Sequence, residues 1–503
     1  MVSSKHSKEL RRLALSVLQP GFVGTEAPAW VLREIGDGLA SVVLFARNIV
    51  SLEQIAELTG QLRAENPALI IAIDEEAGDV TRIESATGST RPGNFALGTV
   101  DDIDLTESVA AGLGRQLRAA GVSLDYAPSA DVNSNPDNPI IGVRSFGVDP
   151  TVVSRHTAAW IQGLQSAGVA ACAKHFPGHG DVAVDSHHGL PTYGATRDEI
   201  ATQALPPFRA ALDAGVRAVM SGHLLVPAYD PDLPATLSPR ILDGLLRREL
   251  GFEGMIVTDA IEMGAVADRY GIDGATVRAV VAGADAICVG GENAEEATVG
   301  LLAGSLVDAV VRGDLSHDRL EEAAGRVQEF AGWSAGLTQA DTVDTISNDI
   351  GFAAARRAIR LAGAVQDALP LSAAPHVVEF VATTNLAIGK ETPWGVAAPL
   401  LERLPGTTIA RVRHQDLHSQ SAALEACALE SATGRPLVVV VRDASRHEWM
   451  ARALADLIAA RPDAIVVEMG LPGAAVPGAR QIFTHGATAA SGVAAAEVLV
   501  GSR

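Results

Sequence analysis

The sequence has few cysteines, few aromatic residues and few basic residues for its length of 503. Its three cysteines, Cys172, Cys288 and Cys427, fit neither a zinc site nor a disulfide framework, so we expect inert thiols in a reducing compartment. Only 39 lysines and arginines stand against 60 aspartates and glutamates, which gives a formal net charge of −21. Because nucleic acid and anionic membranes attract basic surfaces, this balance argues against both as main partners.

Long hydrophobic runs are missing as well. No apolar stretch reaches the roughly 20 residues that a membrane-spanning helix needs. The basic N-terminal segment 1–24 lacks the apolar core and the cleavage site of a signal peptide. The C-terminal part contains neither a GxGxxG nor a P-loop motif, and we expect no cofactor. The prediction is a cytoplasmic protein.

What the sequence does contain is a regular alternation of short apolar runs with helix-like segments such as 52–64 and 241–250. Runs that are apolar throughout are typical of parallel strands buried on both faces. Eight such units over roughly 300 residues indicate a (β/α)₈ TIM-type barrel, although a doubly wound open sheet would show a similar alternation. The runs are Gly21–Gly24, Ser41–Phe45, Leu69–Asp74, Ser123–Pro128, Ala171–Phe176, Ala218–His223, Met255–Asp259 and Ala286–Gly290.

A second, smaller α/β domain with a mainly parallel sheet is predicted after the barrel. We expect the barrel to occupy residues 1–335, a polar linker 336–352 and the second domain 353–503. A helix is expected near Phe352–Ala362, and another over Glu448–Ala460. The predicted strands of this domain are Val377–Thr383, Thr408–Val412, Leu437–Arg442, Ala464–Met469 and Gln481–Thr484.

The densest group of polar residues follows the fifth apolar run, in AKHFPGHGDVAVDSHHGLP (173–191). Its prolines and glycines predict a shaped loop, and loops at the carboxyl ends of barrel strands carry function. Asp185 precedes His187 by two residues, so in an extended segment the carboxylate can orient the imidazole. A metal site would use the same residue types, and single histidines such as His179 and His188 also cap loops.

Three further segments place charged residues at or after strand ends. Asp259 ends the seventh run, where it is either a supported carboxylate or the N-cap of the next helix, which we expect to begin near Glu262. Asp74 ends the third run and is followed by Arg82, while Arg144 follows the fourth run. An isolated arginine is more often part of a structural ion pair.

Taken together, these segments resemble glycoside hydrolase family 3, specifically its β-N-acetylglucosaminidase branch. The stretch KHFPGHGD followed by DSHHGLP is similar to that branch's signature loop with a His-Asp dyad, and IDEEAGDVTR is similar to the family's IDQEGGRVxR. APSADVNSNPDNPIIGVRSFG and PATLSPRILDGLLRRELGFEGMIVTDAIEM also resemble family segments. Two departures from the pattern are visible: Ala77-Gly78-Asp79 stands where Gly-Gly-Arg is usual, and Val182 replaces a threonine.

The resemblance implies a retaining hydrolase that removes terminal β-linked N-acetylglucosamine through a covalent glycosyl-enzyme. It implies Asp259 as nucleophile, His187 as acid/base and Asp185 as the partner of His187. The residues that match sugar-holding positions are Asp74, Arg82, Arg144, Lys174 and His175. The expected partner is therefore a small carbohydrate, and cell-wall fragment recycling fits a cytoplasmic enzyme of this family.

Other functions stay open at this point. A neutral imidazole does not repel anions, so phosphate instead of water as acceptor would make the enzyme a phosphorylase. A β-glucosidase of the same family, a metal-dependent amidohydrolase and a catalytically silent sugar-binding barrel are the further alternatives. Trp394 is the residue of the second domain that we would test for sugar stacking, although a packing role is more common for a tryptophan.

Overall fold

The computed structural model describes residues 4–187, 189–336, 349–381, 392–417, 425–473 and 479–502. By residue contacts the chain forms two compact units. The first unit comprises Met1–Glu76, Thr106–Ile141 and Val148–Ser347. The second comprises Ala77–Leu105, Gly142–Gly147 and Asn348–Arg503.

The first unit is built on a curled parallel sheet. Six strands pair in the order β2-β3-β4-β5-β6-β9, and β1 pairs in parallel with β10. A parallel bridge between Val257 and Ala286 links β9 to the segment entering β10. The strands are β1 (Leu18–Pro20), β2 (Ser41–Leu44), β3 (Ile70–Ile73), β4 (Leu124–Asp125), β5 (Ala170–Phe176), β6 (Ala218–Ser221), β9 (Met255–Thr258) and β10 (Ile287–Val289).

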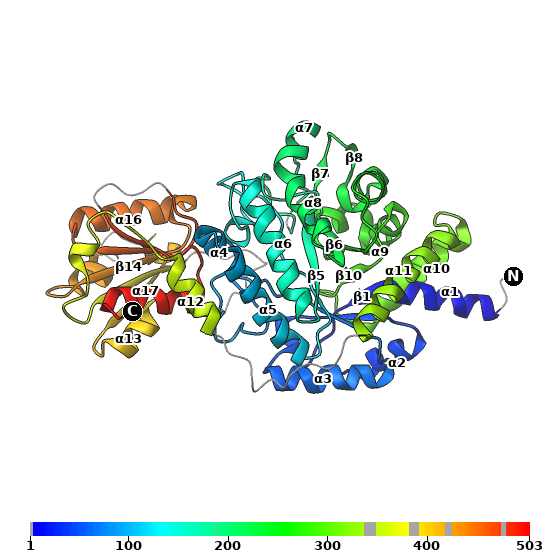
Figure 1. Cartoon of the computed structure of the whole chain (residues 1–503), viewed down its shortest axis with the longest axis horizontal. Helices are drawn as coiled ribbons and strands as arrows, with labels where there is room; N and C mark the ends of the chain where they lie inside the picture. Colours follow the sequence, from blue (N-terminus) through cyan, green and yellow to red (C-terminus); the bar gives the residue numbers. More distant parts are fainter. Residues whose placement is uncertain are drawn as a thin grey trace. The chain divides into compact units, whose positions relative to one another are not determined.

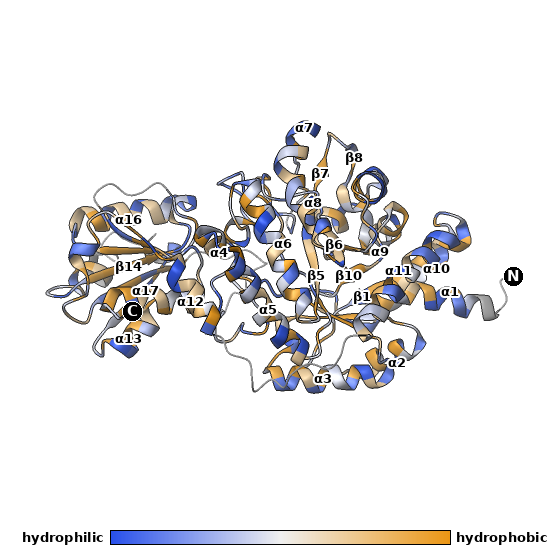
Figure 2. Ribbon diagram, viewed as in Figure 1, coloured by the Kyte–Doolittle hydropathy of each residue, from blue (hydrophilic) through white to orange (hydrophobic). Residues whose placement is uncertain are grey.

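Helices follow most of these strands and lie outside them (Figure 1). The strands are buried along their whole length, whereas the helices bury one face and carry hydrophilic residues on the other (Figure 2). This combination is the arrangement expected for parallel strands under amphipathic helices. The helices are α1 (Ser4–Ser16), α2 (Ala29–Asp37), α3 (Leu52–Glu65), α5 (Ile103–Ala119), α6 (Pro150–Ser166), α7 (Arg197–Glu199), α8 (Leu205–Asp213), α9 (Gly264–Ala282), α10 (Glu296–Arg312) and α11 (His317–Ala335).

The structure corrects the predicted elements of this unit at three places. The first strand is Leu18–Pro20, so the predicted run Gly21–Gly24 lies just after it. A short antiparallel pair, β7 (Leu225–Val226) with β8 (Asp230–Pro234), was not predicted, because Asp and Pro are uncommon in strands. The segment predicted as a helix over 241–250 is π-helical, η5 (Arg240–Glu249).

The second unit contains a six-stranded mixed sheet in the order β11-β16-β15-β14-β12-β13. Five strands are parallel, and β11 pairs antiparallel with β16 at one edge. The strands are β11 (Arg360–Ala362), β12 (His376–Val381), β13 (Thr408–Arg413), β14 (Leu437–Val441), β15 (Ile465–Glu468) and β16 (Arg480–Phe483). The helices are α4 (Asn94–Val100), α12 (Asp349–Ala358), α13 (Ala397–Arg403), α14 (His414–Leu417), α16 (Glu448–Ala460) and α17 (Ala489–Val500).

One predicted helix of this unit is shorter than expected. The helix predicted near Phe352–Ala362 ends at Ala358, and residues 360–362 pair with β16 as an edge strand. The end of the predicted strand Val377–Thr383, most of the predicted linker and His188 lie outside the described residues. The boundary at residue 335 therefore stays a prediction.

Two segments from the first 150 residues belong to the second unit by their contacts. Asp79 is buried there, and its carboxylate binds the Arg442 guanidinium at 2.5 Å and the Ala487 backbone N–H at 2.8 Å. In addition, Arg360 donates to the Thr99 carbonyl oxygen at 2.8 Å. Asp79, which departs from the family pattern, is thus half of a buried ion pair.

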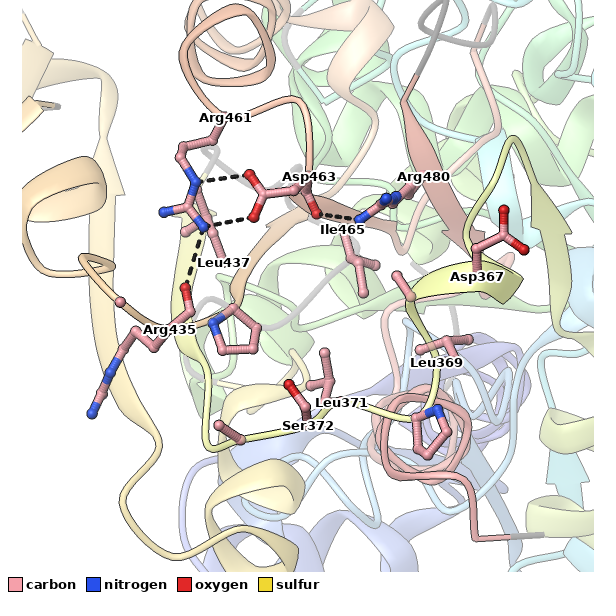
Figure 3. Close-up of a pocket in the computed structure, with 15 residues that line it drawn as sticks. Asp367, Leu369, Leu371, Ser372, Arg435, Leu437, Arg461, Asp463, Ile465 and Arg480 are labelled. Carbon is pink, nitrogen blue, oxygen red and sulfur yellow. Dashed lines mark hydrogen bonds and ion pairs between the residues drawn. The ribbon is translucent and has the colours of Figure 1, made fainter.

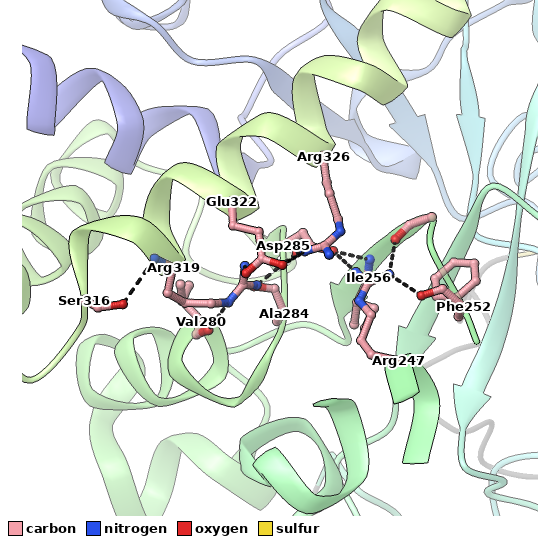
Figure 4. A network of polar contacts seen from close by, with 11 residues as sticks. Arg247, Phe252, Ile256, Val280, Ala284, Asp285, Ser316, Arg319, Glu322 and Arg326 are labelled. Atoms are coloured by element: carbon pink, nitrogen blue, oxygen red, sulfur yellow. Dashed lines mark hydrogen bonds and ion pairs between the residues drawn. The ribbon is translucent and has the colours of Figure 1, made fainter. Parts of the chain in front are cut away.

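A buried carboxylate organises the amino-terminal ends of β9 and β10 in the first unit (Figure 4). Asp285 is fully buried and accepts a hydrogen bond from the Ile256 backbone N–H at 2.9 Å. Arg247 and Arg319 also donate to it, and Arg326 lies 3.4 Å away. In barrels this end of the strands serves stability more than chemistry.

None of the helices in the described part of the chain is both long and apolar enough to span a bilayer.

Candidate active site

Four strands of the first unit end in polar side chains at one edge of the parallel sheet. Asp74 follows β3, Lys174 and His175 lie within β5, and Asp259 follows β9. His223 comes two residues after the end of β6. Because the strands are parallel, these ends lie together, and this is the edge at which barrels place their active sites.

Asp259 is held by backbone hydrogen bonds on both sides. Its N–H donates to the Ser221 carbonyl oxygen at 3.1 Å, and its Oδ1 accepts from the Ala260 N–H at 2.8 Å. Helix α9 begins only at Gly264 with Met263 as its N-cap residue, so the alternative reading of Asp259 as a helix cap is wrong.

The electrostatic surroundings of Asp259 favour its ionised form. Burial raises the pKa of this carboxyl, but the nearby imidazoles of His175, His223 and His187 outweigh it and leave the pKa below its ordinary value. The side chain is only partly buried, so it remains accessible. An ionised, accessible carboxylate at a strand end is suited to nucleophilic attack.

We expect from the sequence that a helix begins near Glu262, but α9 begins at Gly264 and Glu262 has another role. Its Oε1 accepts hydrogen bonds from the backbone N–H groups of Gly290 and Gly291, at 2.8 and 2.5 Å. The carboxylate thereby joins the segment after β9 to the end of β10.

His223 supports the nucleophile segment and was not among the predicted site residues. Its Nε2 lies 2.9 Å from the Ala260 carbonyl oxygen, and its Nδ1 lies 2.8 Å from the Thr236 hydroxyl. Burial lowers the pKa of this imidazole, and because a carbonyl oxygen can only accept, Nε2 carries a proton and donates it. Its place at a strand end was a visible signal, but the sequence does not show which backbone group it contacts.

Asp185 and His187 are in contact through a tight turn rather than an extended segment. Asp185 Oδ1 accepts from the His187 backbone N–H at 2.9 Å and lies 2.7 Å from His187 Nδ1. This is the Asx-turn geometry that Asp forms with the residue two positions on. Their side chains are 12% and 25% exposed, so Nε2 is the ring atom through which His187 can exchange a proton with a ligand.

Lys174 joins Asp74 to a carboxylate that the sequence reading missed. Its buried ammonium contacts Asp74 Oδ1 and lies 2.7 Å from Glu76 Oε1. Asp74 is the more exposed of the two carboxylates, at 24% against 3%. The signal was present, since Glu76 lies in the same acidic motif as Asp74. Lys174 and Asp74 are therefore adjacent cationic and anionic groups able to bind sugar hydroxyls.

Asp131 is the second carboxylate that the sequence did not reveal, and it orients two histidines of the loop. It is fully buried, lies 2.7 Å from His175 Nδ1 and accepts from the His179 backbone N–H at 2.6 Å. Burial raises its pKa, but His175 and His179 together leave the pKa below its ordinary value, so Asp131 is ionised. Its segment, APSADVN, resembled the family, but nothing in the sequence linked it to His175.

The remaining predicted site residues belong to the second unit. Arg82 is half-buried, and Arg144 is buried in a short 3₁₀ turn, η2 (Gly142–Arg144). The Arg144 carbonyl oxygen accepts from Asn94 Nδ2 at 2.7 Å. Trp394 packs against the hydrophobic core of this unit, which favours the packing role for that residue.

Among the described residues, one group of side chains has a geometry that suits a metal ion. It consists of His317, Asp318 and Glu321 near the start of α11, and its two acidic members are exposed. Exposed acidic groups of this kind are common without a metal. The group belongs to another segment of the chain than the loop 173–191, where the metal alternative had been considered.

A cavity of about 590 Å³ lies in the second unit, beside the amino-terminal ends of β14, β15 and β16 (Figure 3). Arg461 forms a two-pronged ion pair with Asp463 at 2.8 and 2.9 Å, and Arg480 donates to the Asp463 carbonyl oxygen at 3.1 Å. These cations are thus engaged within the protein. Ligands of parallel α/β sheets bind at the opposite, carboxyl ends, so this cavity is not the candidate site.

Comparison with known proteins places this geometry in context. Residues 25–330 match the model of the glycosyl hydrolase family 3 N terminal domain. A β-hexosaminidase A from Pseudoalteromonas piscicida is 39% identical over 269 residues, which cover 49% of this chain and 45% of that protein. A β-hexosaminidase from Chromobacterium violaceum is 36% identical over 367 residues, 71% of this chain and 96% of that protein. This chain thus spans less than half the length of the first relative.

Among solved structures, a glycoside hydrolase family 3 β-N-acetylglucosaminidase from Paenibacillus sp. str. FPU-7 superposes with a TM-score of 0.88 at 32% identity. The match covers 98% of this chain and 96% of that one, so the similarity extends over both units.

Proposed function

The chain belongs to glycoside hydrolase family 3, and from that premise we propose that it is a retaining exo-β-N-acetylglucosaminidase. The relatives named β-hexosaminidase and the similar β-N-acetylglucosaminidase structure support this substrate class. The observation that carries the proposal is the contact between Asp185 and His187. The imidazole of His187 also lowers the pKa of Asp259, the expected nucleophile. A carboxylate nucleophile and an oriented proton donor are what glycoside cleavage requires.

In the first step, a carboxylate oxygen of Asp259 bonds to the anomeric carbon as the glycosidic C–O bond breaks. His187 gives its Nε2 proton to the departing oxygen, and Asp185 stabilises the protonated imidazole through Nδ1. In the second step, the neutral imidazole takes a proton from water, whose oxygen displaces Asp259. Two displacements at one carbon retain the β configuration.

We assign the binding of the non-reducing sugar to Asp74, Lys174 and His175, and the sugar-holding roles of Arg82 and Arg144 stay predictions from the resemblance. The contacts of Lys174 with Asp74 and of His175 with Asp131 support this assignment, because they hold the side chains in defined orientations before the sugar arrives.

Water is the acceptor in this proposal, and product analysis tests it. We expect the purified chain to release β-N-acetylglucosamine from a β-N-acetylglucosaminide, with or without phosphate, as followed by NMR of the first-formed anomer. A sugar 1-phosphate formed only with phosphate would identify a phosphorylase. Faster cleavage of the matching β-glucoside would identify a β-glucosidase, and loss of activity in chelator would point to a metalloenzyme.

We also infer that the eight parallel strands of the first unit close into a (β/α)₈ barrel. At the β9 edge of the six-stranded sheet, the bridge between Val257 and Ala286 continues the sheet toward β10, which in turn pairs with β1. At the other edge, the Ser41 hydroxyl in β2 donates to the Leu18 carbonyl oxygen in β1 at 3.3 Å. Slow amide exchange in both β1 and β2 would support closure. The cytoplasm as compartment and cell-wall fragments as natural substrates stay predictions.

A further inference from the structure

We propose that His179 is a positioning residue that fastens the Asp185–His187 pair through the hydroxyl of Ser186. The proposal rests on the proposed function, because it concerns proton transfer by His187 to a leaving group. It gives a role in proton transfer to a histidine for which capping of the loop was the alternative expected from the sequence.

The first half of the loop, residues 175–182, is a fixed platform. Asn138 Nδ2 donates to the His179 carbonyl oxygen at 2.8 Å, and Asp131 accepts from the His179 N–H at 2.6 Å. Further along, the Ser134 hydroxyl donates to Asp181 at 2.9 Å. A side chain at Gly180 would place its Cβ 1.8 Å from the Val132 carbonyl oxygen, so the two segments pack at backbone distance.

Among the described residues, the second half of the loop is more exposed than the first. Ala183 and Val184 are exposed, whereas Ser186, between the two residues of the dyad, is only 2% exposed. The Ser186 hydroxyl lies 3.2 Å from His179 Nε2, and its carbonyl oxygen accepts from the Ala265 N–H at 3.3 Å. Ser186 is therefore the buried point at which the dyad is attached to the platform and to the start of α9.

The chemistry of His179 suits a donor in this contact. Burial, followed by the charge of His175, lowers the pKa of this imidazole to about 4, so it is neutral near pH 7. Its Nδ1 is buried without a hydrogen-bond partner in the described part of the structure. Placing the ring proton on Nε2 gives that N–H an acceptor, the Ser186 hydroxyl, and avoids a buried unpaired donor.

A purely structural role and a positioning role differ in their dependence on the leaving group. Proton donation matters for a sugar alcohol and little for an activated phenol, because the phenolate leaves without help. A loop that merely folds less well lowers the rates of both substrates equally. The ratio of kcat/KM for a β-linked GlcNAc disaccharide to that for the 2,4-dinitrophenyl glycoside separates the two roles.

The variants to compare are Ser186→Ala and His179→Leu, which remove the contact, and His179→Gln, which keeps an N–H donor near the place of Nε2. We expect the first two to lose about 10- to 100-fold on the disaccharide, part of the about 10²- to 10⁴-fold that general acid catalysis contributes, and less than about 3-fold on the dinitrophenyl glycoside. His179→Gln is expected to recover most of the disaccharide rate. His187→Ala removes the proton donor itself, so its loss on the disaccharide relative to the dinitrophenyl glycoside is the upper limit for the other variants.

Thr106→Val is the matched control, because it removes another buried histidine–hydroxyl contact, 2.8 Å between Thr106 and His156, from the α5–α6 interface. It should lower Tm by a similar amount and leave the substrate ratio unchanged. Equal losses on both substrates in Ser186→Ala, or no loss at all, would overturn the proposal. If the wild-type chain leaves the dinitrophenyl glycoside intact, the proposed function fails instead.

Discussion

At the scale of single residues, the properties of the site are set by a few close neighbours. Asp259 is kept ionised because three imidazoles outweigh the effect of burial on its pKa. His223 holds the carbonyl oxygen next to the nucleophile, and burial lowers the pKa of its imidazole. Histidine side chains thus act on Asp259 in two ways, by their electrostatic effect on its pKa and by holding the backbone beside it.

Asp259→Asn is the direct test of the nucleophile. The variant keeps the size of the side chain and an oxygen for the Ala260 N–H, but it cannot form the glycosyl-enzyme. We expect kcat on a nitrophenyl β-N-acetylglucosaminide to fall by about 10⁴-fold or more, as for other essential groups of a covalent mechanism. Unchanged Tm is the control for folding, and near wild-type turnover would remove Asp259 from its role.

At the scale of elements, buried charges fasten strands and helices together. Asp285 ties η5 and α11 to the amino-terminal ends of β9 and β10 through Arg247, Arg319 and Arg326. Because these groups are largely withdrawn from water, removing the carboxylate leaves the arginines without their common partner.

Asp285→Ala should therefore lower the free energy of unfolding by about 3–5 kcal/mol, as expected for a broken buried pair. Denaturant unfolding measures the loss. The exposed pair Arg312–Asp314, with side chains 60% and 59% exposed, provides the control, and Asp314→Ala should cost less than about 1 kcal/mol. Equal losses in the two variants would contradict a special role for the Asp285 cluster.

His485 links the segment after β16 to the end of α12 by contacting the Ala358 carbonyl oxygen through Nδ1 at 3.0 Å. Burial lowers the pKa of this imidazole to about 4. A depressed histidine pKa means that the folded state binds fewer protons than the unfolded chain, whose histidine pKa is about 6.5. The contribution of His485 is therefore fully present above pH 6.5 and is lost as the pH falls toward 4.

We expect this titration to remove on the order of 3 kcal/mol between pH 6.5 and pH 4. The measurement compares unfolding of the wild-type chain with that of His485→Gln across this interval. Since the variant lacks the titrating group, its stability should decline less steeply. Parallel curves for the two proteins would show that His485 titrates normally.

The local sequence pattern predicted most of the helices and strands but not all of them. The alternation of apolar runs and amphipathic segments placed most strands within two residues, because burial on both faces leaves a clear mark on composition. It failed at Arg360–Ala362, where an edge strand is made by pairing with β16 rather than by its own residues. The turn between Asp185 and His187 was also missed, since its hydrogen bonds depend on backbone angles that their spacing does not specify.

At the scale of the whole molecule, the compact units do not follow chain order. Segments 77–105 and 142–147 belong by their contacts to the second unit, where Asp79 pairs with Arg442 and the Ala490 N–H donates to the Ser89 carbonyl oxygen at 3.1 Å. A cut at residue 336 would separate these groups from their partners.

A chain that ends at residue 336 keeps the whole parallel sheet of the first unit, but residues 77–105 lose their partners. We therefore expect this segment to be less stable in the truncated chain than in the full chain. We expect limited proteolysis to cleave it first within residues 77–105, which the full chain protects. The single substitution Arg442→Ala in the full chain should expose the same segment to a smaller degree. Equal protection of residues 77–105 in the truncated and full chains would show that the first 336 residues are sufficient for their packing.

The strand-and-helix alternation, the family and the candidate residues Asp259, His187 and Asp185 could be predicted from the sequence, because these depend on local composition and on motifs. The folded chain was needed to show that Asp259 is not a helix cap, that Asp131 and Glu76 hold His175 and Lys174, and that Asp79 pairs with Arg442. The reason is physical: these contacts join residues from about 40 to more than 350 positions apart, and only the folded backbone brings them within hydrogen-bond distance.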